Sequence, residues 1–85
     1  MKHFASPSFW ERYADLPKDI QSLADRNFEL LKTNPKHPSL HFKKAGRFQS
    51  ARVGLRYRAL GVEIPDGMLW FWIGPHSEYD KILSQ

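Results

Sequence analysis

The sequence predicts an α+β fold, with an N-terminal helical hairpin packed on a small, mainly antiparallel sheet of three to four strands and a short C-terminal helix. The first 34 residues carry apolar side chains at helical spacing, whereas the remainder reads as short strands separated by turn residues. The length of 85 residues indicates a single domain, residues 1–85. Its core should be modest, because a chain this short buries only about 60% of its unfolded surface.

Two helices are expected before the strands. The first covers residues 7–14, since Ser6 is a favoured N-cap and Pro7 suits the first helical position. The second covers residues 18–33 and ends at the Asn-Pro dipeptide at 34–35. Its apolar residues recur at helical spacing: Ile20, Leu23, Ala24, Phe28 and Leu31. Neither helix is expected to be stable alone, so both should cover a sheet.

Strand-like segments dominate the second half of the chain. They span residues 39–44, 49–55, 56–64 and 68–74, and the short terminal helix follows near residues 77–81. Asp66-Gly67 predicts a two-residue type I′ hairpin between the last two strands. The segment 68–74 is apolar on both faces, which is typical of a central strand. Alternation places Trp70 and Trp72 on one face, as core residues or as a platform for stacked bases.

The positive charge of the chain is regional. Lys and Arg total 13 against 9 Asp and Glu, and the sequence pI is about 9.6, so an acidic partner such as nucleic acid or an acidic protein segment is favoured. Residues 36–58 hold seven cations and no acid: Lys36, Lys43, Lys44, Arg47, Arg52, Arg56 and Arg58. Such a stretch is either a binding surface or a solvated basic face.

Several classes of protein are disfavoured by composition. The absence of cysteine excludes a disulfide scaffold and thiolate metal sites and indicates a reducing compartment. No apolar run reaches the length of a signal peptide or a membrane span, so a cytoplasmic protein with no membrane partner is expected. His37 and His41 are four residues apart, but Pro38 prevents the helix that would place both on one face. Neither a metal site nor a cofactor is predicted.

The order of these features resembles the RelE/ParE toxin superfamily of bacterial toxin–antitoxin modules over nearly the whole chain. The most specific parts of the resemblance are Arg52-Val53-Gly54, Tyr57-Arg58 and the segment Gly74-Pro75-His76-Ser77-Glu78-Tyr79. The family usually opens with a full strand, but only residues 1–5 precede the first helix here, so that strand is expected to be very short or absent. The chain also has one apparent extra residue between Arg52 and Tyr57, and His76 stands where ribosome-dependent RelE members usually carry arginine.

The resemblance implies a toxin that inhibits translation by cutting mRNA at the ribosome, without a metal or another cofactor. In this chemistry the ribose 2′-hydroxyl attacks the neighbouring phosphate and leaves a 2′,3′-cyclic phosphate. His76 and Tyr79 are the candidates for the two proton transfers, with their roles left open, while Arg58, and secondly Arg52, would stabilise the phosphorane. Flanking phosphates and ribosomal RNA would be held by Lys43, Lys44, Arg47 and Arg56.

The resemblance also implies partners and alternatives. A cognate antitoxin would wrap an acidic or amphipathic tail around the basic groove, and the helix residues Phe9, Trp10 and Tyr13 are candidates for that interface. A ParE-like toxin, which binds DNA gyrase without nuclease activity, is the second hypothesis, and a plain RNA-binding or interaction module or an inactive relative is the third.

Each candidate catalytic residue also has a structural interpretation. Arg58 is in phase with apolar positions of its strand, so it is either the phosphate clamp or a half-buried ion pair with Glu78 or Asp80. The ring of His76 would instead pack on Trp72, and Tyr79 would be a packing residue with its hydroxyl in water.

Overall fold

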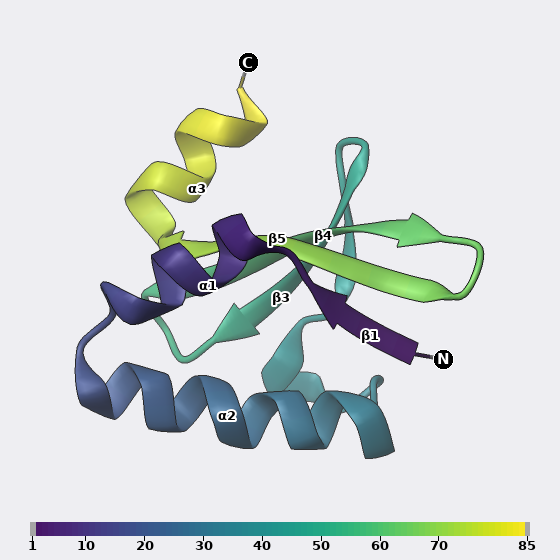
Figure 1. The fold of residues 1–85 in the computed structure, drawn as a ribbon, viewed down its shortest axis with the longest axis horizontal. Helices are drawn as coiled ribbons and strands as arrows, with labels where there is room; N and C mark the ends of the chain where they lie inside the picture. Colours follow the sequence, from purple (N-terminus) through teal and green to yellow (C-terminus); the bar gives the residue numbers. More distant parts are fainter. Residues whose placement is uncertain (1, 85) are drawn as a thin grey trace.

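The computed structural model describes residues 2–84 and shows one five-stranded sheet with helices on both faces (Figure 1). The strand order is β1-β5-β4-β3-β2, with β1 parallel to β5 and all other neighbours antiparallel. In chain order the elements are β1 (Lys2–Ala5), α1 (Pro7–Ala14), α2 (Lys18–Thr33), the 3₁₀ turn η1 (Pro38–Leu40), β2 (Lys43–Ala45), β3 (Phe48–Val53), β4 (Tyr57–Ile64), β5 (Gly67–Pro75) and α3 (His76–Leu83). The predicted α+β class is confirmed.

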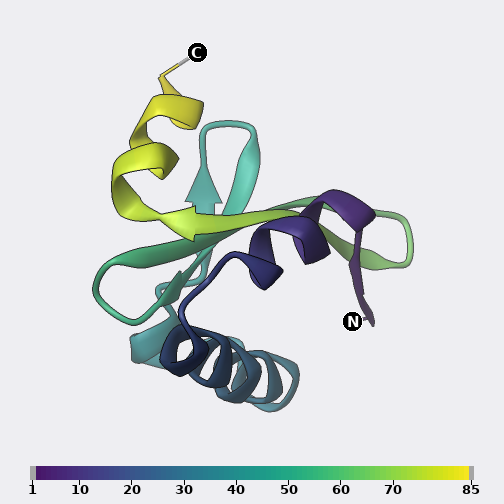
Figure 2. The ribbon, with the colours of Figure 1, turned by 60° about the vertical axis from the view of Figure 1, so that its left-hand side comes forward.

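Both N-terminal helices have the predicted bounds. Ser6 caps α1 by accepting the backbone N–H of Phe9 on its hydroxyl at 3.3 Å, and Pro7 occupies the first helical position. The helix α1 packs on β5 and α2 packs on β3. The C-terminal helix α3 lies on the other side of the sheet, as Figure 2 shows.

The sheet has more strands than the three to four predicted. Residues 2–5 form β1, which pairs with β5 from Lys2↔Gly67 to Ala5↔Trp70. Four residues are too few for alternation to reveal a strand. The segment expected as a strand over residues 39–44 instead begins with η1, because Pro38 constrains the backbone and His37 accepts the N–H of Ser39 on its ring.

The predicted β4–β5 hairpin is present, but its turn lies one residue earlier than expected. Ile64 pairs with Gly67, so the two loop residues are Pro65 and Asp66. Gly67 has a φ of 150° and stands where a side chain would overlap the backbone of Lys2. Glycine is therefore favoured here both by this φ and by the close approach of β1.

The prediction that Trp70 and Trp72 share a face is wrong. Leu60 pairs with Trp72 and the adjacent Gly61 pairs with Trp70, so Phe71 is an extra residue that forms a β-bulge. The bulge changes the phase of alternation. Trp70 therefore packs on the side of α1 and α2, whereas Trp72 packs on the side of α3.

The core accordingly has two parts. The larger lies between the sheet and the helices α1 and α2, and its most buried members include Leu40, Met68 and Ile73. The smaller lies beneath α3 and contains Leu60, Trp72 and Tyr79. Both tryptophans are core residues, which disfavours their use as a platform for stacked bases. None of the helices within residues 2–84 has both the length and the apolar character needed to cross a membrane.

Candidate nucleic-acid interface

A pocket of about 410 Å³ lies where the β3–β4 loop meets the start of α3. Its basic members are Arg56, Arg58 and His76. The loop turns sharply at Gly54, whose φ of 67° is costly for other residues. The backbone N–H of His76 then donates to the carbonyl of Arg56 at 2.7 Å, and this bond joins the start of α3 to the loop.

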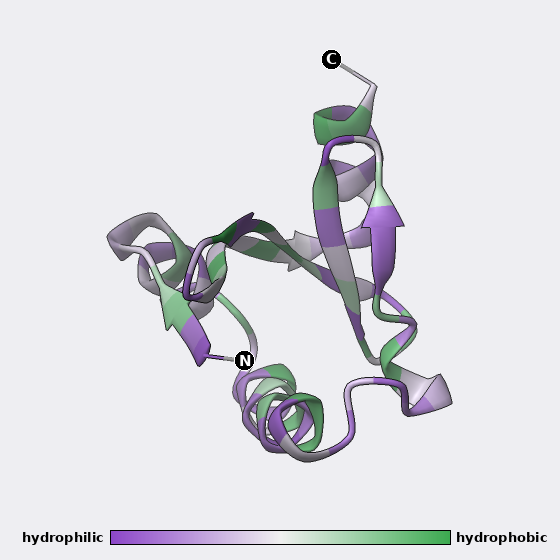
Figure 3. Ribbon diagram, turned by 90° about the vertical axis from the view of Figure 1, so that its right-hand side faces the viewer, coloured by the Kyte–Doolittle hydropathy of each residue, from purple (hydrophilic) through white to green (hydrophobic). Residues whose placement is uncertain are grey.

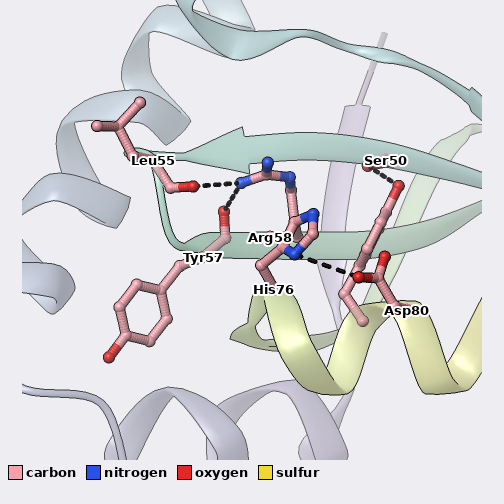
Figure 4. A network of polar contacts seen from close by, with 7 residues as sticks. Ser50, Leu55, Tyr57, Arg58, His76 and Asp80 are labelled. Atoms are coloured by element: carbon pink, nitrogen blue, oxygen red, sulfur yellow. Dashed lines mark hydrogen bonds and ion pairs between the residues drawn. The ribbon is translucent and has the colours of Figure 1, made fainter.

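Arg58 lines this pocket and is held by its loop. Its Nη1 donates to the carbonyl oxygens of Tyr57 at 2.8 Å and Leu55 at 3.3 Å (Figure 4). Its guanidinium also lies over the ring of Tyr79, 5.9 Å from the ring centroid. Within residues 2–84 the side chain makes no ion pair with Glu78 or Asp80, so that interpretation of Arg58 is not supported.

A second arginine stands directly opposite Arg58 across the β3–β4 ladder. Arg52 and Arg58 are paired in register, so their side chains share the face of the sheet that α3 covers. The Nε of Arg52 is buried without a hydrogen-bond partner within residues 2–84. The pKa of Arg58 is lowered, mainly by burial and secondly by the nearby positive charge of Arg52. The guanidinium nevertheless remains protonated at neutral pH. Two arginines paired in register on one face of the sheet favour a bound anion.

His76 is the first residue of α3 and is open to solvent. Its Nδ1 lies 3.3 Å from the carboxylate Oδ2 of Asp80, one helical turn along. Its ring stacks on Tyr79 at a centroid distance of 5.8 Å. The predicted alternative, packing on Trp72, is therefore replaced by a contact with Tyr79, and Asp80 orients the imidazole.

Tyr79 differs from the other candidates because it is buried, with a relative exposure of 7%. Its hydroxyl donates to the Oγ of Ser50 at 3.1 Å, and Ser50 is 2% exposed. The interpretation that placed this hydroxyl in water is therefore wrong. The ring contacts both Arg58 and His76, while the hydroxyl is bonded to the buried Ser50.

Two polar contacts of this region were not predicted from the sequence: the pairing of Asp80 with His76 and the bond between Ser50 and Tyr79. Asp80 follows His76 by four residues, and this spacing on a helix is a signal that sequence reasoning uses for charged pairs. Ser50 carries no local signal, because its role depends on the register between β3 and β4 and on the docking of α3.

The remaining predicted RNA-binding residues lie on the β2–β3 hairpin. Lys43, Lys44 and Arg47 are exposed, and the Arg47 guanidinium lies 5.5 Å from the centroid of the Phe48 ring. The hairpin rises on the same side of the sheet as α3 in two views (Figures 1 and 2), and β2 is largely hydrophilic (Figure 3). One face of the molecule therefore carries both the Arg58 pocket and a basic hairpin. Residues 2–84 contain no group of three histidine, aspartate or glutamate side chains placed to hold a metal ion.

Fold and site together define the class of protein: a small α+β domain with a basic face around α3. No protein-family model and no curated protein sequence matches the chain. Its structure is similar to a chain of the RelB-RelE antitoxin–toxin complex from Methanococcus jannaschii, with a TM-score of 0.72, 18% identity and coverage of 92% of this chain and 96% of that one.

A second similar structure is a copper-bound mutant toxin from Helicobacter pylori. The TM-score is 0.61, the identity 18%, and the match covers 92% of this chain and 97% of that one. The chain therefore has the RelE/ParE toxin fold, as the resemblance of its sequence predicted.

Proposed function

We propose that this protein is the toxin of a type II toxin–antitoxin module and that it inhibits translation by cutting mRNA at the ribosome. The observation that carries the proposal is the Arg52–Arg58 pair beside His76. The two arginines are paired across the β3–β4 ladder without an ion-pair partner in residues 2–84, and a titratable side chain, His76, lines the same pocket as Arg58. This arrangement fits a phosphodiester better than a neutral ligand.

The chemistry follows from this arrangement. The RNA 2′-hydroxyl attacks the adjacent phosphorus, the P–O5′ bond breaks, and the products are a 2′,3′-cyclic phosphate and a 5′-hydroxyl. Arg58, assisted by Arg52, stabilises the extra negative charge of the phosphorane, which makes a metal ion unnecessary. His76 transfers one of the two protons, because its imidazole is exposed at the pocket and is oriented by Asp80.

Tyr79 acts as a positioning residue in this proposal. Its ring contacts both Arg58 and His76, and its hydroxyl is hydrogen-bonded to Ser50. The hydroxyl would reach a substrate only after that bond breaks. Lys43, Lys44, Arg47 and Arg56 bind flanking phosphates of the message and of ribosomal RNA.

The proposed partners are the ribosome, the mRNA and a cognate antitoxin, all in the cytoplasm. The structurally similar M. jannaschii toxin was crystallised with its RelB antitoxin, which supports an antitoxin partner for this chain. An antitoxin with an acidic segment would neutralise the basic face around α3.

Binding and inhibition of DNA gyrase, as in ParE-like toxins, is the alternative. It is favoured by His76, which stands where ribosome-dependent RelE members usually carry arginine.

The test is an in vitro translation reaction in which mRNA 5′ ends are mapped by primer extension. The wild type is expected to introduce cuts only in translated message. Arg58→Ala and His76→Ala should abolish them, whereas Tyr79→Phe should retain them because it keeps the ring. Arg12→Ala on the exposed side of α1 removes an equal charge and is the matched control. Intact message with normal translation would refute the proposal and direct the work to a gyrase supercoiling assay.

A further inference from the structure

The face of the sheet opposite α3 contains a second cavity. Its volume is about 340 Å³, and it lies between α1, α2, β1 and the sheet. Three exposed aromatic side chains line it: Phe4 at 42%, Trp10 at 55% and Phe28 at 39% relative exposure. Large apolar side chains gathered around one cavity indicate a binding site more than a solvated surface.

The walls of this cavity are mainly aromatic. One wall is formed by three residues of α1, Phe9, Trp10 and Tyr13. The Trp10 ring is edge-on to its two neighbours, with ring centroids 5.3 Å apart for Phe9 and 5.4 Å apart for Tyr13. Phe28 and Trp70 contribute rings from α2 and from the sheet. Rings pack well on rings in offset or edge-to-face geometry. The volume is at the lower end of the range of about 300–1,000 Å³ for ligand sites, so it suits one or two fused rings with a short side chain.

The carboxylate of Asp25 is the one acidic group among the described residues that line the cavity. It accepts a hydrogen bond from the hydroxyl of Tyr13 at 2.8 Å. This bond to a carboxylate is the main cause of the raised pKa of Tyr13. Asp25 makes no ion pair within residues 2–84. Its second oxygen is therefore open to a cation.

The basic side chains near the cavity do not compete for Asp25. Burial lowers the pKa of His3, and its Nδ1 accepts the indole N–H of Trp70 at 3.1 Å, so His3 is held in its neutral form. Lys32 is paired with Glu29 at 2.7 Å. Arg52 contributes to the wall from β3, but alternation directs its side chain to the α3 face beside Arg58.

We propose that this cavity binds a small aromatic amine, with the ring inside and the ammonium group on the Asp25 carboxylate. The aromatic wall of α1 would add cation–π attraction to the ion pair. A neutral ligand would leave the carboxylate unpaired, and an anionic one would be repelled by it. The site is on the opposite side of the sheet from the Arg58 pocket, so it does not depend on the proposed nuclease function.

The test compares 2-(1-naphthyl)ethylamine with 3-(1-naphthyl)propionate, which present the same ring with opposite charges. Binding to the full chain is measured by isothermal titration calorimetry and located by ¹H–¹⁵N NMR shift changes. The amine is expected to bind about tenfold more tightly than the acid, equivalent to about 1.4 kcal/mol, with shifts at residues of the cavity.

Three variants separate the possible explanations. Asp25→Asn keeps an acceptor for Tyr13 but removes the charge, so the preference for the amine should fall to about twofold or less, since only cation–π attraction remains. Asp19→Asn, on the same helix outside the cavity, is the matched control and should keep the preference. Ala24→Leu should fill the cavity and weaken both ligands. Equal affinity for both ligands, no binding, or a tenfold preference that is unchanged in Asp25→Asn would overturn the proposal.

Discussion

The buried hydrogen bond between Tyr79 and Ser50 permits a quantitative prediction. Tyr79→Phe removes the donor and leaves the Ser50 hydroxyl buried, at 2% exposure, without this partner. An unsatisfied buried polar group costs about 1–3 kcal/mol of unfolding free energy. The ring volume is almost unchanged, so no cavity is added. We therefore expect Tyr79→Phe to lower the unfolding free energy by about 1–3 kcal/mol, or the melting temperature by about 4–8 °C per kcal/mol.

The reciprocal variant provides the thermodynamic test. Ser50→Ala leaves the Tyr79 hydroxyl buried without a partner and should destabilise the protein by a similar amount. The double variant removes both polar groups, so it should be no less stable than either single variant. Urea unfolding followed by tryptophan fluorescence measures all four proteins. Equal denaturant slopes would indicate that the denatured states are comparable.

Additive losses in the double variant would refute the assignment of a coupled, buried bond. The same would follow if Tyr79→Phe were as stable as the wild type. The translation assay gives the functional counterpart, because loss of mRNA cutting by a stable, folded Tyr79→Phe protein would mean that the hydroxyl itself takes part in the reaction.

Three further predictions concern other parts of the molecule. Gly61→Ala should cost about 1–3 kcal/mol in urea unfolding, because its methyl group would lie 2.9 Å from the carbonyl of residue 69 in a packed region. Unchanged stability would contradict this. The pKa of His3 is lowered by folding, so the unfolded chain binds its proton more readily, and stability should fall as pH decreases below about 6.5. The part of this slope due to His3 should disappear in His3→Gln, measured by thermal unfolding between pH 5 and pH 8. Lys43, Lys44 and Arg47 should contribute to the salt dependence of binding to single-stranded RNA. Replacing all three by alanine should reduce the slope of log K against log salt concentration by about 2 in magnitude, because each phosphate contact contributes about 0.7. Fluorescence anisotropy at several salt concentrations gives this slope, and an unchanged slope would exclude phosphate contacts at the hairpin.

The helices could be predicted from the sequence because their signals are local. Ser6 and Pro7 specify the start of α1, and the Asn-Pro dipeptide at 34–35 ends α2, so both sets of bounds were correct. The change from helical to strand periodicity also predicted the α+β class and the β4–β5 hairpin. These features depend on backbone preferences within a few residues, which a single sequence contains.

The strands show where local reasoning ends. Alternation placed Trp70 and Trp72 on one face, but the bulge at Phe71 separates them, because a bulge depends on how β5 pairs with β4. The first strand, expected to be very short or absent, is very short; the sequence left these alternatives open because its four residues become a strand only by pairing with β5.

The candidate site divides in the same way. Its basic character could be predicted from the sequence because charge is a property of the chain, and the resemblance to the RelE/ParE superfamily made Arg52, Arg58 and His76 the candidates. The opposition of the two arginines across β3 and β4, and the burial of the Tyr79 hydroxyl on Ser50, were decided by the tertiary structure. Both depend on strand register and on the docking of α3, which bring together residues far apart in the sequence and give the Tyr79 hydroxyl its partner.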